Sequence, residues 1–262
     1  MPEENSDKNG VIKNLISSGA EIAGGALGGA LGFLAGGPAG AAAGGAGGAA
    51  AAVALKHIGH EVGERYLAPR EKARAGGVLA IAADNINRRV DAGEELRKDG
   101  FFENSDNNRT AAEEIAESVI LKAQKEPEEK KISFIGNLLS NISFDSQISP
   151  EMGHQIIKIA EQLTYRQLCI LKLAAVKQNL NLKDGDYRGH GSFQKDLYQV
   201  LYECLDLYHR GLVNFGGDVA FGPTDVKPAH ITIQGLGADI FNLMGLMQIP
   251  DGDVLNIARV LK

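Results

Sequence analysis

The side chains that most often perform catalysis or bind metals are sparse in this chain. It has six histidines and two cysteines in 262 residues. His57 and His60, followed by Glu61, have the closest spacing, but they match neither HExxH nor HxxEH, so we interpret them as structural or interfacial. Cys169 and Cys204 are too few for a disulfide framework or a thiolate metal site. Both lie in apolar helical patterns, where a thiol acts as a small hydrophobic group.

Other chemical motifs are also missing from the sequence. It contains no Walker loop, no GxSxG and no constellation of carboxylates. Gly185-Asp186 and Asp251-Gly252-Asp253 are turn sequences that do not fit a calcium loop. We therefore expect no enzyme, no catalytic residue, no metal and no cofactor.

Charge and cysteine content restrict the class of protein further. The net charge is −6, from 33 acidic and 27 basic residues, which argues against nucleic acid as a partner. Reduced cysteines suit a cytoplasmic body. The acidic start MPEENSDKNG lacks the basic region of a secretory signal, so we expect a protein that is not secreted.

The most unusual feature is a glycine register near the N-terminus. Residues 22–55 include 12 of the 33 glycines and no charged side chain. Seven of these glycines recur at four-residue steps on either side of Gly37-Pro38. They are Gly24, Gly28, Gly32, Gly36, Gly40, Gly44 and Gly48. On a helix, residues four apart share a face, so the register predicts grooves without side chains.

Pro38 divides the register into two helical arms. Each four-residue step turns the groove by about 40°, so seven glycines on one straight helix would face no single partner. Proline removes a backbone donor and disfavours helix at the preceding residue. We therefore predict arms at roughly 20–36 and 39–58, with Gly37 and Pro38 in the turn between them.

Close packing of helix backbones can offset the free-energy cost of placing many glycines in a helix. Each glycine costs about 0.8–1 kcal/mol relative to alanine, and close helix approach regains stability where lipid surrounds the pair. The register resembles the glycine zipper, GxxxGxxxG, of membrane-inserting and pore-forming proteins. This resemblance implies membrane lipids and further copies of the chain as partners, with Glu21, Lys56, His57 and His60 as the membrane border.

Three interpretations of this segment remain open. A single 34-residue helix would extend about 51 Å, whereas each arm, at about 24–30 Å, fits a bilayer core of ~30 Å. Residues 39–52 hold no side chain larger than alanine, so the second arm inserts poorly by itself. A membrane hairpin, a flexible linker and a soluble close-packed hairpin are the alternatives.

The remaining chain is predicted to be mainly helical. Thr110 with Glu113, and Thr164 with Gln167, form capping boxes, and Pro127 suits the first position of a helix that extends to Ile142. A basic cluster, Arg70, Lys72 and Arg74, suits either anionic headgroups or a solvated helix face. Helices are further expected near 151–163, 194–212, 235–246 and 251–261, with a strand at 230–233.

The C-terminal segment resembles a winged-helix module. A helix, the sequence Gly211-Leu212-Val213, a strand and a second helix follow in that order. Winged helices often read DNA, but residues 164–262 hold ten acids and ten bases, and helix 194–212 has a mixed-charge surface. A sensing role through protein contact is the favoured interpretation.

Five segments result from these patterns, and we predict a mainly α fold. They are a polar tail (1–20), a glycine-zipper hairpin (21–58), an amphipathic segment and loop (59–109), a helical body (110–163) and a winged-helix-like module (164–262). This plan, with the patterns at 132–171 and 231–246, resembles bacterial abortive-infection anti-phage effectors of the alpha group.

The function expected from these features is conditional disruption of a membrane. The hairpin would insert and oligomerise under control of the helical body, which would associate with the inner membrane from the cytoplasm, and a regulatory protein partner would fit this scheme. A static membrane anchor and a soluble winged-helix DNA-binding regulator are the alternatives.

Overall fold

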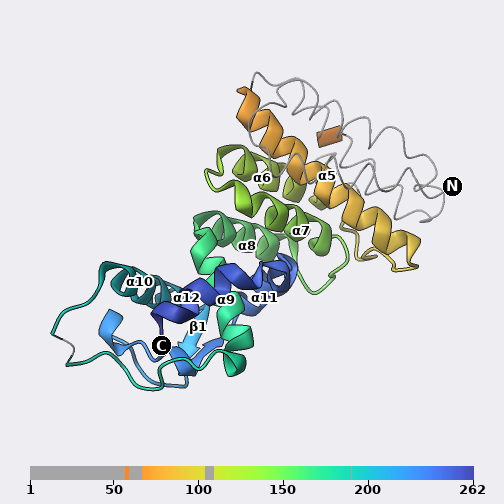
Figure 1. The fold of residues 1–262 in the computed structure, drawn as a ribbon. Helices are drawn as coiled ribbons and strands as arrows, with labels where there is room; N and C mark the ends of the chain where they lie inside the picture. The colour runs from red at the N-terminus through yellow and green to blue at the C-terminus, as the bar shows by residue number, and fades with distance from the viewer. Residues whose placement is uncertain (1–56, 59–66, 104–108, 190) are drawn as a thin grey trace. The chain divides into compact units, whose positions relative to one another are not determined.

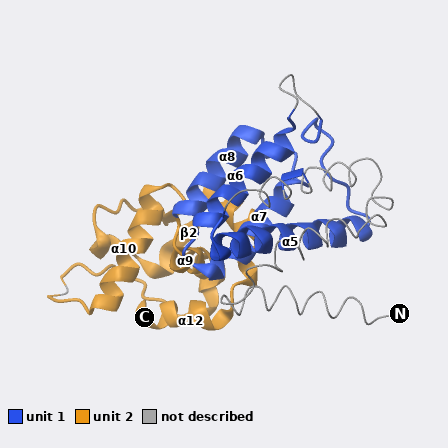
Figure 2. Cartoon of the chain, turned by 90° about the horizontal axis from the view of Figure 1, so that it is seen from above, with its two compact units in different colours: residues 1–162 blue, residues 163–262 orange. Residues whose placement is uncertain are grey.

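A computed structural model describes residues 57–58, 67–103, 109–189 and 191–262, and this part of the chain is mainly α-helical (Figure 1). The predicted arms of the glycine hairpin and its turn lie outside the described residues. The chain forms two compact units, Met1–Gln162 and Leu163–Lys262 (Figure 2). With the labels of Figure 1, the described elements of unit 1 are α5 (Pro69–Asp91), α6 (Ala111–Lys125), α7 (Ile132–Ile142) and α8 (Pro150–Gln162). Those of unit 2 are α9 (Tyr165–Val176), α10 (Lys195–His209), β1 (Val213–Phe215), β2 (Ile231–Ile233), α11 (Leu236–Leu243) and α12 (Asp251–Val260).

Unit 1 is organised around α5, a helix of 23 residues. Pro69 occupies its first turn, where the missing N–H costs nothing, and Glu71 accepts a hydrogen bond from the Ala68 N–H at 2.9 Å. Helices α6 and α7 pack against it. Helix α7 approaches α5 closely at Gly136. A Cβ on Gly136 would lie 2.7 Å from Ile81 Cγ2, so glycine is required at this crossing.

Both predicted capping boxes are confirmed. The Thr110 hydroxyl accepts a hydrogen bond from the Glu113 N–H at 3.1 Å, and the Glu113 carboxylate accepts one from the Thr110 N–H at 2.9 Å. Thr164 and Gln167 make the same reciprocal pair at the start of α9. These local signals fix where α6 and α9 begin because they satisfy backbone donors that have no partner within the helix.

The prediction that Pro127 begins a helix is wrong. A short 3-10 helix, Glu129–Lys131, precedes α7, which begins at Ile132. The chain between α6 and α7 instead folds around the buried carboxylate of Glu126. This carboxylate accepts a hydrogen bond from the Glu128 N–H at 3.0 Å and one from Lys131 Nζ at 2.5 Å. Satisfying a buried carboxylate outweighs the local preference of proline for a first helical turn.

Unit 2 combines its helices with a two-stranded antiparallel hairpin. Val213 pairs with Ile233 and Phe215 with Ile231, and residues 216–230 connect the strands. The Phe215 ring stacks on Tyr208 of α10 with centroids 5.2 Å apart. Helix α9 is linked to the start of α12 by Lys172, whose Nζ donates to the Ile249 carbonyl and to Asp251, each at 2.6 Å.

Gly237 marks the tightest backbone approach in unit 2. A Cβ there would lie 2.1 Å from the Leu212 carbonyl oxygen, so Gly237→Ala must displace backbone and is expected to lower the free energy of unfolding by about 1–3 kcal/mol. Gly252 is the matched control, since a Cβ there meets nothing within 4 Å. Gly252→Ala should leave stability unchanged or raise it by up to about 1 kcal/mol. Urea titrations followed by circular dichroism measure both, and equal losses would contradict the explanation.

Candidate functional site

The predicted membrane segment falls largely outside the described part of the chain. The seven register glycines, Gly37, Pro38, Glu21 and Lys56 belong to residues 1–56, and His60 belongs to residues 59–66. His57 is the predicted site residue that the structure places. Its surroundings therefore define the geometry at the C-terminal end of the glycine-rich segment, which we take as residues 22–55.

His57 contacts the start of helix α6. Its Nδ1 lies 3.1 Å from Glu113 Oε1, and the other carboxylate oxygen of Glu113 completes the capping box with Thr110. The His57 side chain is 55% exposed and that of Glu113 12%. The contact becomes a full ion pair only when the imidazole is protonated. Ile58, the next residue, is fully buried. The polar contact of His57 thus joins the chain that leaves the glycine-rich segment to the start of α6.

The bases of the cluster at the start of α5 differ in their surroundings. Arg74 Nη1 donates a hydrogen bond to the Gln124 carbonyl at 3.2 Å, in the last turn of α6. A cation at this position stabilises the negative end of the helix dipole. Arg70 is exposed. Sequence reasoning treated the three bases as one surface, whereas the structure gives Arg74 a contact within unit 1.

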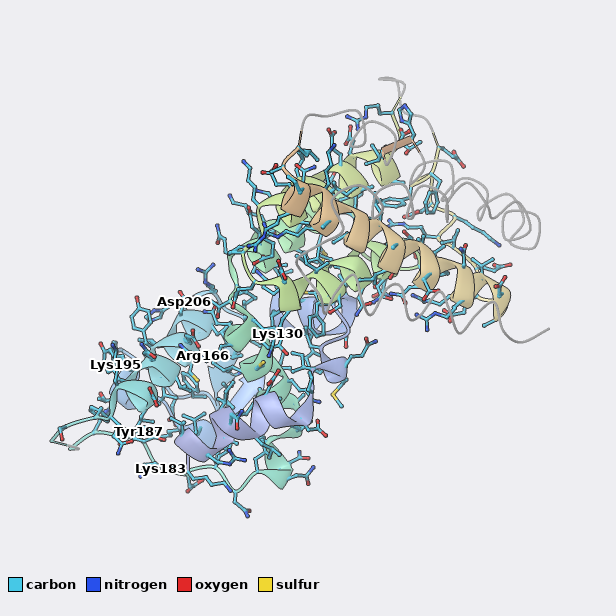
Figure 3. All side chains as sticks on the ribbon, turned by 45° about the horizontal axis from the view of Figure 1, so that its top comes forward. Lys130, Arg166, Lys183, Tyr187, Lys195 and Asp206 are labelled. Atoms are coloured by element: carbon cyan, nitrogen blue, oxygen red, sulfur yellow. The ribbon has the colours of Figure 1, made fainter. Side chains whose placement is uncertain are left out.

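Helix α10 presents a surface with two aromatic side chains. Tyr198 and Tyr202 are 50% and 58% exposed, and they share a face because they are four residues apart. Their spacing is visible in the sequence. Figure 3 labels Lys195 and Asp206, which lie toward opposite ends of the helix, and Arg166 of α9.

Acidic side chains on α10 are already engaged within unit 2. Glu203 accepts hydrogen bonds from Arg166 Nε at 2.5 Å and from Arg166 Nη2 at 3.0 Å. Asp206 accepts from Gln167 Nε2 at 2.7 Å and from Arg210 Nε at 2.8 Å. The two arginines, Arg166 and Arg210, therefore bind carboxylates within unit 2.

The Cys204 thiol and the Tyr187 hydroxyl are buried, and both fit a role in the packing of unit 2. Burial raises the pKa of the Cys204 thiol to about 12 and that of the Tyr187 hydroxyl to about 12. Cys169 is buried as well. Lys183 Nζ lies 5.3 Å from the centroid of the Tyr187 ring, and both residues are labelled in Figure 3. A thiol with a raised pKa is a poor nucleophile at neutral pH because the thiolate is the reactive form.

Within the described ranges no group of three or more His, Cys, Asp or Glu side chains is arranged to hold a metal ion. His230 Nε2 instead lies 2.9 Å from Asp184, a single contact of a histidine with a carboxylate.

Both native thiols are expected to resist alkylation in the folded chain. Iodoacetamide at pH 8 should label neither Cys169 nor Cys204 until urea unfolds the protein, because both are buried and the Cys204 thiol stays protonated. The raised pKa of Cys204 stabilises the fold below about pH 9, its ordinary value, and this contribution is lost as pH rises toward 12. Mass spectrometry of the alkylated chain measures the labelling. Stoichiometric labelling of the native protein would contradict the described burial.

Over the part of the chain that the structure describes, every helix is too short or too polar to cross a bilayer. Comparison of the chain with protein-family models, with curated proteins and with solved structures finds no match.

Proposed function

We propose that this protein is a membrane-disrupting effector whose glycine-rich segment inserts into a bilayer and associates with further copies. The observation that carries the proposal is the four-residue glycine register in 34 residues without a charge. Such a register provides two short grooves, and grooves of this kind permit close approach of helices in lipid. Effectors of bacterial defence and toxins are the class of protein that this activity fits.

Weak insertion of single segments favours a conditional mechanism. Strongly apolar side chains drive insertion by only about 0.3–0.6 kcal/mol each, and the second arm has few of them. Packing of backbones between copies supplies the remaining stabilisation. The segment would therefore stay withdrawn in single molecules, shielded by the helical body or by a partner, and would become stable in lipid when several copies meet.

The contact of His57 supports a role for unit 1 in holding the segment. It fixes the chain two residues after residue 55, at the start of α6. A signal that loosens unit 1 would free the segment from this attachment. Unit 1 is therefore proposed as the body that keeps the segment withdrawn.

Unit 2 is proposed as the sensor of that signal. Its order of helix, hairpin and helix supports a winged-helix-like module, in which α10 stands where such modules carry their recognition helix. Tyr198 and Tyr202 favour contact with a protein, since the nearby arginines bind Glu203 and Asp206. A phosphate backbone would compete with these carboxylates for the same cations.

Fractionation of cells that express the full chain tests membrane association. After induction, the chain is expected to sediment with membranes and to resist extraction by alkaline carbonate, because inserted segments are not removed by high pH. Growth arrest should accompany this shift. Complete release by carbonate would contradict insertion, and permanent sedimentation without toxicity would favour the static anchor. Salt-sensitive, sequence-selective DNA binding by the full chain would favour the regulator.

A further inference from the structure

Three aspartates of the chain are followed directly by glycine. They are Asp99, Asp184 and Asp251. An Asp-Gly dipeptide can rearrange without an enzyme, because glycine has no side chain to shield its backbone nitrogen from the aspartate carboxyl. The three sites share the same local sequence, so the fold decides which of them reacts.

The rearrangement consists of a condensation and a hydrolysis. The backbone nitrogen of the glycine attacks the side-chain carboxyl carbon of the protonated aspartate, a C–N bond forms, and the carboxyl OH leaves with the amide hydrogen as water. Water then adds to the main-chain carbonyl of the resulting succinimide ring and breaks its bond to the nitrogen. The product is isoaspartate, in which the peptide bond passes through the side-chain carbon and the former main-chain carbonyl is a free carboxylate. One water leaves and one enters, so the mass is unchanged.

The fold restrains two of the three aspartates. Arg97, whose side chain is 1% exposed, donates from Nε to Asp99 Oδ1 at 2.8 Å and from Nη2 to Oδ2 at 2.5 Å. This pairing lowers the pKa of the Asp99 carboxyl, which is therefore held ionised and in place. Asp251 begins α12 and accepts a hydrogen bond from Lys172 Nζ at 2.6 Å. Ring closure there requires rotation of the aspartate backbone out of the helical range, which would disrupt the first turn of α12.

Asp184 and Gly185 have different surroundings. Both are exposed, and they lie in irregular chain between α9 and α10. The Asp184 side chain is 91% exposed, and its contact with His230 Nε2 at 2.9 Å is a surface contact that water readily replaces. Space is also available at Gly185, because a Cβ there would meet nothing within 4 Å. The carboxyl and the nitrogen of this dipeptide can thus approach each other without disturbing a helix or a buried ion pair.

We propose that Asp184-Gly185 is a site of spontaneous isoaspartate formation, whereas the fold protects Asp99 and Asp251 from the same reaction. Exposure, secondary structure and ion pairing account for the selectivity, since the dipeptides are alike. The modification requires neither a partner nor a membrane, so it is independent of the function proposed above.

The modified site would lie between two attachments of its loop to the connection between β1 and β2. On one side the Lys183 carbonyl accepts a hydrogen bond from the Ala229 N–H at 3.0 Å, and on the other the Tyr187 N–H donates to the Thr224 carbonyl at 2.8 Å. Lys183 and Tyr187 are labelled in Figure 3. Isoaspartate adds a methylene carbon to the main chain between these attachments, so both hydrogen bonds should weaken.

Ageing of the full chain tests the selectivity. The purified protein is kept for several weeks at neutral pH and digested, and electron-transfer fragmentation of the peptides identifies isoaspartate by cleavage of its additional backbone bond. We expect at least about tenfold more isoaspartate at Asp184 than at Asp99 or Asp251, because ordered structure must open before the other two react. In urea the three fractions should become similar. Comparable fractions in the folded chain, no isoaspartate at Asp184, or the same selectivity in urea would overturn the proposal.

Substitution of the glycine tests the attacking nitrogen. Gly185→Ala should slow isoaspartate formation at Asp184 at least about fivefold, because its methyl group shields the nitrogen. The fold accommodates this methyl group, since it meets nothing within 4 Å. Gly252→Ala is the matched control, which is accommodated equally and should leave the rate at Asp184 unchanged. Equal rates in both variants would overturn the proposal.

Hydrogen exchange measures the effect on the loop. In the aged fraction that carries isoaspartate, separated by ion-exchange chromatography, the amide hydrogens of Tyr187 and Ala229 are expected to exchange at least about tenfold faster than in fresh protein. Amides within α12 provide the internal control and should exchange at the same rate in both samples. Unchanged exchange at Tyr187 and Ala229 would overturn the predicted weakening of the attachments.

Discussion

Replacement of two register glycines is expected to abolish most vesicle leakage. In liposomes loaded with a self-quenched dye, Gly28→Leu with Gly32→Leu should reduce release at least about tenfold at equal protein concentration, the effect of losing roughly 1.4 kcal/mol of helix packing. Leucine makes insertion itself more favourable, by about 0.3–0.6 kcal/mol per residue. A loss of leakage therefore reports packing between backbones and excludes weaker entry into the bilayer as the cause.

Ala26→Leu with Ala30→Leu is the matched control for this experiment. The two alanines have the same four-residue spacing in the same predicted arm, but they lie two positions away from the glycine register, about 200° round the helix. The control adds nearly the same hydrophobic volume, one methyl group less per site, and leaves the groove open. It should leak as the original chain does, and identical behaviour of both double variants would reject the zipper mechanism.

The second large effect is expected at the buried ion pair of unit 1. Lys131 Nζ lies 2.5 Å from Glu126 Oε2, and the two side chains are 1% and 3% exposed. Glu126→Gln keeps the shape of the side chain but leaves the ammonium buried beside a neutral amide. We expect the free energy of unfolding to fall by about 3–5 kcal/mol, measured by urea titration.

A double variant separates the loss of the ion pair from the cost of leaving one buried charge without its partner. Glu126→Gln with Lys131→Met removes both charges, so it should recover most of the stability that the single substitution loses. Glu95→Gln is the surface control, because Glu95 pairs with Lys98 while both side chains are more than 70% exposed. No measurable change is expected there. A double variant as unstable as Glu126→Gln alone would mean that shape, and not charge, is what the site requires.

Local signals in the sequence were sufficient to predict most helix starts. Thr110 with Glu113 and Thr164 with Gln167 satisfy their own backbone donors, so the tertiary fold did not need to add anything. The strand at 230–233 was also visible, because Ile231 and Ile233 alternate with Thr232. The mainly α class follows from these short-range patterns, since each depends on residues within one or two turns.

Contacts between distant residues decided what the sequence could not. The helix predicted to begin at Pro127 begins at Ile132 instead, because the Glu128 N–H and Lys131 Nζ both donate hydrogen bonds to the buried carboxylate of Glu126. Arg74 was one of three equivalent bases in the sequence, and it became a cap for α6 because Gln124, fifty residues away, was brought beside it.

The division between sequence and tertiary structure is clearest at the glycine-rich segment and α5. Seven evenly spaced glycines and the absence of charge are properties of composition and period, so the sequence by itself carries the prediction that residues 22–55 pack backbone to backbone. The burial of Gly76, Leu79, Ala80 and Ala83 in α5 needed the tertiary structure, because their type and spacing resemble any apolar helix face. Burial is a property of all surrounding chains at once, and no window of sequence contains it.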